Sequence, residues 1–354
     1  MFNPKRLALA RMRRRMSAKA LAELSGITAD TLSRLEKGHR APEEGTVAKL
    51  ASALGYPSEF FFGEDPADVN HESVSFRSFS KMSAKEKDAA ISAGSLGLQL
   101  SAWAEKRFNF PKPDLPDLSY ERNAEDAAAH ARQYWGIGER PIGNMIGLLE
   151  SKGVRVLSLS EDTANVNAFS FWRDGIPYVF LNNFKTPESS IFDAAHELGH
   201  LLMHNKGDLR GDRLLEREAD SFASSFLIPL NDLKAQVTRP ITSSRIIAAK
   251  GRWRVSAFAL LYRLYRSGIV PTEHQYRSLC IDLSRRGYRS AEPVGIVREV
   301  STVWKQVFAA LWSDRVTKAD VAKELLIPLD ELEGLVANMM SDLTRPEGRS
   351  LRIV

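Results

Sequence analysis

Three of the seven histidines in this 354-residue chain lie within nine residues, at positions 196, 200 and 204. If the segment is helical, His196 and His200 project from one face, where their ring nitrogens can converge on a single Zn²⁺. Glu197 follows His196 directly and would lie about 100° around the helix, beside the remaining coordination position. A carboxylate there can take a proton from zinc-bound water and pass it to a leaving amine. The spacing therefore predicts a zinc centre that hydrolyses peptide bonds.

The elements predicted around these residues fit that chemistry. An apolar stripe at helical spacing marks residues 190–204 as an amphipathic helix, and its members are Ile191, Ala194, Ala195, Leu198, Leu201 and Leu202. Strands are predicted at Val154–Leu159, Asn167–Trp172 and Ile176–Asn182. In zinc hydrolases of this type an edge strand often aligns the peptide by β-augmentation, and Tyr178–Leu181 is the candidate.

A catalytic zinc site needs a third protein ligand and leaves one position for water. The following predicted helix, residues 214–229, is the expected source. The stretch HELGHLLMH at 196–204, followed by EREADSFASSFLIP at 216–229, resembles the ImmA/IrrE family of metallo-endopeptidases. In that family the glutamate directly before an Ala-Asp or Ala-Asn pair is the usual third ligand, which implies Glu218. Glu216 lies about 200° away on a helix, which favours a solvated charge, and it is the second choice for the third ligand.

His204 has two interpretations that the sequence leaves open. As a catalytic residue, it would hydrogen-bond a tetrahedral intermediate or a ligand. Alternatively, it only ends the helix favourably by interacting with the helix dipole.

The composition excludes several classes of protein. A hydrophobic fraction of 44% and a charged fraction of 26% exclude a disordered chain. We find no run of about eighteen apolar residues and no signal peptide, so we expect a cytoplasmic protein without a membrane partner. Cys280 is the only cysteine, which excludes an internal disulfide and a cysteine-based zinc site.

Positive charge is concentrated near the N-terminus. Residues 1–50 contain eleven Lys and Arg against five Asp and Glu, a net charge of +6 in a chain whose total is +5. This asymmetry indicates a polyanionic partner for the segment. Ser17 and Thr28 are suited to cap helices, and Gly26 is suited to the sharp turn between them.

Residues 20–38, ALAELSGITADTLSRLEKG, closely resemble the Cro/phage-repressor (XRE) family of DNA-binding proteins. The resemblance implies a five-helix domain whose third helix enters the major groove of double-stranded operator DNA, and a homodimer that reads two half-sites. The base-facing residues would be Thr28, Ala29, Asp30 and Thr31, and those near the phosphates Arg14, Arg15, Ser33, Arg34 and Arg40. The alternative is a bundle that serves protein contacts alone, but the charge of +6 favours DNA.

We predict a mainly α fold with a small β-sheet, divided into four parts. Residues 1–63 form the helix-turn-helix domain, 64–118 a linker with a long helix, and 119–230 an α+β, zincin-like metallopeptidase domain. Residues 231–354 form a helical region for dimerisation or sensing. Within it, Thr317–Leu325 and Pro328–Met339 are a helix pair expected to serve packing or dimerisation.

The combined pattern predicts a transcriptional regulator that carries a zinc-dependent endopeptidase. Its substrate would be a protein or peptide: a repressor, the chain itself or a toxin-associated substrate. Two other functions stay open: a non-enzymatic regulator whose peptidase-like domain senses a metal, peptide or small ligand, and an antitoxin-like protein whose second domain binds a partner.

Overall fold

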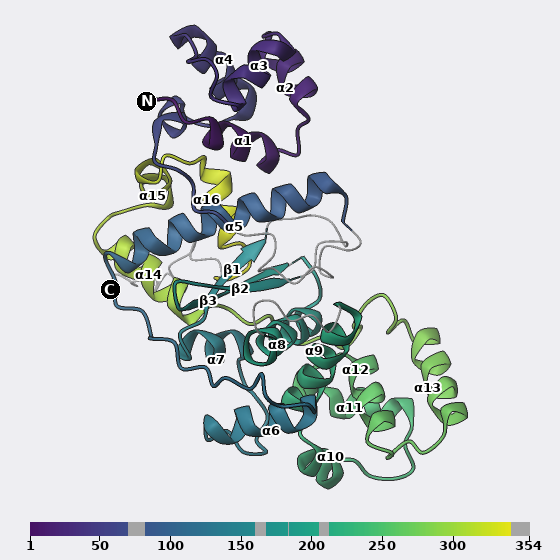
Figure 1. Cartoon of the computed structure of the whole chain (residues 1–354). Coiled ribbons are helices and arrows are strands. Elements are labelled where there is room, and N and C mark those ends of the chain that lie inside the picture. Colours follow the sequence, from purple (N-terminus) through teal and green to yellow (C-terminus); the bar gives the residue numbers. More distant parts are fainter. Residues whose placement is uncertain (70–81, 160–167, 183, 205–211, 341–354) are drawn as a thin grey trace, which may run out of the picture.

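The computed structural model describes residues 1–69, 82–159, 168–182, 184–204 and 212–340. These residues form sixteen α-helices and one three-stranded sheet (Figure 1). The predicted fold class, mainly α with a small sheet, is therefore confirmed. Asn167, the first residue of a predicted strand, and residues 341–354 lie outside the described residues.

The N-terminal bundle forms as its capping residues predict. It contains α1 (Pro4–Arg13), α2 (Ala18–Ser25), α3 (Ala29–Glu36), α4 (Glu44–Leu54) and the 3₁₀ helix η1 (Ser58–Phe62). The side chains of Ser17 and Thr28 accept hydrogen bonds from the first turns of α2 and α3, which satisfies backbone donors left free at a helix start. Gly26 has φ 65° in the turn between them, a conformation that favours glycine. These features fix the turn between α2 and α3.

The sheet has the order β1-β3-β2, with β1 (Arg155–Leu159) parallel and β2 (Phe169–Arg173) antiparallel to β3 (Ile176–Asn182). The central strand is therefore β3. Its residue Tyr178 pairs with Arg155 on one side and Phe171 on the other. The prediction that Tyr178–Leu181 is an edge strand is wrong, because both of its edges are occupied by neighbouring strands.

Helices cover both faces of the sheet (Figure 1). On one face, the rings of Phe169, Phe171 and Phe180 pack together and meet α5 (Ala84–Glu105). A Cβ atom at Gly97 of α5 would lie only 2.6 Å from the Phe180 ring, so glycine permits this close approach. On the other face, α8 (Pro187–Met203) contacts β2 and β3.

The remaining helices form two groups. In the first, α6 (Ala124–Tyr134), α7 (Met145–Ser151) and α9 (Asp212–Leu227) contact α8. It continues with α10 (Leu230–Gln236), α11 (Ser243–Trp253), α12 (Ala257–Arg266) and α13 (Glu273–Arg285), where α12 contacts α9, α11 and α13. The second is the chain's return segment, α14 (Thr302–Ser313), α15 (Lys318–Glu324) and α16 (Leu329–Leu335). In this segment α14 contacts α7, and α16 contacts β1 and α5.

The return segment also holds the N-terminal bundle. The Glu331 side chain is only 3% exposed and forms ion pairs with Arg13 Nε at 2.7 Å and Arg14 Nη1 at 3.2 Å. Its carboxylate also accepts a hydrogen bond of 3.1 Å from the Tyr56 hydroxyl. Arg14 also contacts Asp330 at 2.7 Å. The helix pair predicted for packing or dimerisation therefore packs within the chain, and its second helix ends at Leu335 rather than at Met339.

Replacing Glu331 by Ala is expected to destabilise this junction. Removing one partner of a buried ion pair leaves the other charges unpaired and costs about 3–5 kcal/mol. The loss should appear in urea titrations followed by hydrogen exchange of the N-terminal bundle. Asp330, whose side chain is 61% exposed, provides the matched control. The Asp330→Ala variant should lose about 1 kcal/mol or less, and equal losses in the two variants would contradict the interpretation.

Candidate metal centre and nucleic-acid interface

Two histidines of α8 and a glutamate of α9 converge on one point. His196 Nε2 and His200 Nε2 are 3.1 Å apart, and each lies 3.3 Å from a carboxylate oxygen of Glu216. Ligand atoms bound to a tetrahedral zinc at 2.0–2.1 Å are about 3.3 Å apart. The three side chains therefore have both the donor types and the separations that a zinc ion requires, and they leave one position of the tetrahedron for water.

The structure brings Glu216 to the two histidines, and not Glu218, which was expected as the third ligand. Glu218 Oε2 lies 3.1 Å from His204 Nε2 instead. α9 meets α8 along the stripe that contains Glu216 and Asp220. Residues two positions apart on a helix project about 200° apart, so Glu216 and Glu218 cannot both face the histidine pair. The expectation for Glu218 is corrected in favour of its alternative, Glu216.

Asp220 is a site residue that the sequence analysis missed. Its Oδ1 lies 2.9 Å from His196 Nδ1, on the side of the ring away from Glu216. A carboxylate in this position holds the ring so that the opposite nitrogen faces the metal. The available signal was the spacing of four residues between Glu216 and Asp220, which places both on one helical stripe.

Hydrogen bonds within the cluster shift the pKa values of His196 and Glu216 in opposite directions. Burial lowers the pKa of His196, but hydrogen bonds with Asp220 and Glu216 outweigh burial and raise that pKa to about 10. Burial likewise tends to raise the pKa of Glu216, and hydrogen bonds from both histidines reverse the shift and lower it. The carboxylate of Glu216 is therefore in its charged form, the form that binds a cation.

Glu197 lies beside the cluster and is 1% exposed. Its Oε2 accepts a hydrogen bond of 2.7 Å from the Ser170 hydroxyl on β2. Burial raises the pKa of Glu197, which suits a group that must accept a proton and return it. No sequence motif pointed to Ser170, whose role depends on how β2 packs against α8.

His204 is the residue at which α8 ends. Its Nδ1 lies 2.8 Å from His200 Nδ1, and its Nε2 faces Glu218. His204 is thus placed behind His200, on the side of that ring opposite Glu216.

The predicted nucleic-acid interface is largely exposed on the N-terminal bundle. Thr28, Ala29, Asp30, Arg34 and Arg40 are exposed, and Thr31, Ser33 and Arg15 are half-buried. Arg14 differs from expectation, because Leu54 O, Asp330 and the Tyr56 ring engage its guanidinium group. It therefore serves the junction with α16 in this structure.

Comparison with family models identifies the two parts of the chain. Residues 149–265 match the IrrE N-terminal-like domain, and residues 7–61 match the helix-turn-helix model. The chain joins a helix-turn-helix DNA-binding domain to an IrrE-like peptidase domain. No curated protein sequence matches the chain at a significant level.

The IrrE-like match includes the whole candidate metal centre and extends through most of α12. His196, His200 and Glu216 form the one His/Cys/Asp/Glu group in the described part of the chain whose donor atoms are close enough to hold a metal ion. Among the described helices, none is both long and apolar enough to cross a membrane.

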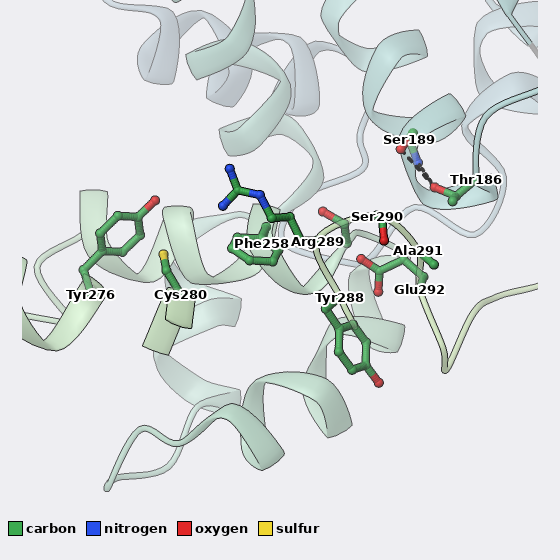
Figure 2. A pocket seen from close by; sticks show the side chains of 11 residues that line it. Thr186, Ser189, Phe258, Tyr276, Cys280, Tyr288, Arg289, Ser290, Ala291 and Glu292 are labelled. Carbon is green, nitrogen blue, oxygen red and sulfur yellow. Dashed lines mark hydrogen bonds between the residues drawn. The ribbon is translucent and has the colours of Figure 1, made fainter. Parts of the chain in front are cut away.

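A separate cavity of about 570 Å³ lies where the start of α8 meets α12, α13 and residues 288–292 (Figure 2). Thr186 and Ser189 line it from the first turn of α8, whereas His196 and His200 lie in the later half of that helix. None of the predicted site residues lines the cavity, so it is not part of the metal centre.

Replacing Glu216 by Ala should remove most of the bound zinc from the IrrE-like domain, because the variant lacks a direct ligand. Because Glu218 contacts His204 and not the His196–His200 pair, the Glu218→Ala variant should retain more zinc after gel filtration than the Glu216→Ala variant. Elemental analysis of both proteins measures the difference. The reverse order would return the third-ligand role to Glu218.

Proposed function

We propose that this protein is a DNA-binding transcriptional regulator whose IrrE-like domain is a zinc-dependent endopeptidase that cuts a repressor protein or the chain itself. The observation that carries the proposal is the convergence of His196, His200 and Glu216 at tetrahedral separations, directly beside the buried Glu197.

The residues have distinct roles in this proposal. His196, His200 and Glu216 would hold the zinc, which when bound supplies a water molecule of lowered pKa. Glu197 accepts a proton from the attacking water and returns it to the leaving amine. The Ser170 hydroxyl, 2.7 Å from Glu197 Oε2, orients that carboxylate. Asp220 keeps the proton of His196 on Nδ1, so that Nε2 faces the metal.

The substrate peptide would align along β2 rather than β3. In the described sheet, β2 is an edge strand. Ser170 on β2 contacts Glu197, and Trp172 Nε1 donates to Leu201 O of α8. A peptide added to the outer edge of β2 would therefore run beside the general base, as β-augmentation requires.

The helix-turn-helix domain would bind operator DNA as a homodimer, with the exposed start of α3 in the major groove. Arg34 and Arg40 are 59% and 53% exposed and make only surface ion pairs, with Asp30 and Glu43. Such pairs are weak, so both guanidinium groups can exchange partners for phosphate. A DNA partner supports a cytoplasmic location.

Replacing Glu197 by Gln should preserve zinc binding and lower the rate of peptide cleavage at least about 100-fold, because the amide cannot accept the proton. The assay incubates purified protein with cell lysate, with and without chelator, and maps new N-termini by mass spectrometry. Asp193→Asn is the matched control, since Asp193 lies on the same helix but pairs with Lys185. Unchanged cleavage by the Gln variant would exclude the general-base role of Glu197.

Replacing Arg34 or Arg40 by Ala should weaken binding to a short mixed-sequence DNA duplex. Each change should also reduce the slope of log affinity against log salt by about one, because one phosphate contact is lost. Fluorescence anisotropy over a salt series measures both effects. Arg277→Ala on α13, where Arg277 is 73% exposed, should leave the slope unchanged. A slope insensitive to all three changes would favour a bundle that contacts only proteins.

A further inference from the structure

His200 is held from behind by two residues that do not reach the metal position. Its Nε2 lies 3.3 Å from Glu216, while its Nδ1 lies 2.8 Å from His204 Nδ1. His204 Nε2 in turn lies 3.1 Å from Glu218 Oε2. The side chains of His200, His204 and Glu218 are 9%, 6% and 14% exposed. These three residues form a continuous and largely buried hydrogen-bonded series.

We propose that His204 and Glu218 are positioning residues that fix the tautomer of His200, so that its Nε2 lone pair faces the metal. The inference builds on the proposed zinc centre and assigns a role to two residues that centre does not use as ligands. In this arrangement each of the two histidine ligands is supported by a carboxylate, directly by Asp220 for His196 and through His204 for His200.

The number of protons in the series determines which nitrogen of each ring is protonated. Each neutral imidazole carries one N–H and one lone pair. A ligand Nε2 leaves the proton of His200 on Nδ1, which must donate to an unprotonated Nδ1 of His204. The proton of His204 is then on Nε2 and donates to the Glu218 carboxylate. Every contact in the series contains one donor and one acceptor.

The opposite arrangement is disfavoured by Glu218. If His204 carried its proton on Nδ1, its Nε2 lone pair would face the carboxylate, and two acceptors would repel each other. The same arrangement would force the proton of His200 onto Nε2, where it would block the metal. The carboxylate of Glu218 therefore selects the competent tautomer across two rings.

The two helices provide the required spacing. His204 follows His200 by one turn of α8 and ends that helix. Glu218 lies two residues after Glu216 on α9, on a different stripe. The contact between α8 and α9 thus places Glu216 between the Nε2 atoms of His196 and His200, Asp220 at Nδ1 of His196, and Glu218 at His204, behind His200.

The test measures the zinc dissociation constant of the full-length protein by competition with a chelator of known affinity. His204→Ala and Glu218→Ala should each bind zinc about 10–100-fold more weakly. The double variant should be no weaker than either single variant, because the two residues act in series. His204→Asn should restore most of the affinity, since its amide oxygen can accept from His200 Nδ1.

A purely structural role of His204 as the helix end predicts another outcome. Melting temperature would fall while the zinc affinity of the folded protein stayed constant, and that result would overturn the proposal. Arg217→Ala, an exposed neighbour on α9, is the matched control and should match the wild type. The ¹⁵N shifts of labelled histidine supply an independent readout, since a change in the His200 tautomer on loss of Glu218 is expected.

Failure of the metal centre is distinguishable from failure of this inference. If the wild type binds no zinc, both proposals are overturned. If the wild type and all His204 and Glu218 variants bind zinc equally, only the positioning role is wrong. If the affinities follow the expected order but no substrate is cut, the positioning role stands and the enzymatic function is wrong.

Discussion

The packing of α8 against α9 is the interaction on which the candidate metal centre depends. α8 supplies two imidazoles, but the carboxylates of Glu216 and Asp220 arrive from α9. The approach is close at Gly199, between the two histidines, where a Cβ atom would lie 3.1 Å from the Phe222 ring. A side chain at this position would push the helices apart. Because Glu216 and Asp220 each lie about 3 Å from a ring nitrogen of His196, a small separation of the helices would move both carboxylates away from that ring.

The sheet and the return segment keep that helix pair in place. α8 lies on one face of the sheet, and α5 covers the other (Figure 1). The start of α14 is fixed by Glu150 of α7, whose carboxylate accepts hydrogen bonds from the backbone N–H groups of Thr302 and Val303. One residue later, Trp304 Nε1 donates a hydrogen bond to Val156 O of β1. Glu197 therefore lies within a layered body whose closing contacts come from the return segment.

Local signals made much of the molecule predictable. Ser17, Gly26 and Thr28 determine the helix-turn-helix geometry through capping and a left-handed turn, and the spacing of His196 and His200 depends only on helix periodicity. The choice between Glu216 and Glu218 depended on the rotation of α9 relative to α8, which tertiary packing sets. The central place of β3 depended on a parallel pairing with β1, which no local pattern encodes. These failures share one cause, since each concerns an element's relation to a distant partner.

The Glu331 junction also has a consequence for the order in which the protein is assembled. Arg13 and its partner are separated by 318 positions in the sequence. Domains generally fold as units during synthesis, beginning with the N-terminal one. The helix-turn-helix bundle can therefore bury its own core long before residue 331 has been made, with Arg13 and Arg14 still in water. Translation thus produces the helix-turn-helix domain before the segment that joins it to the IrrE-like body.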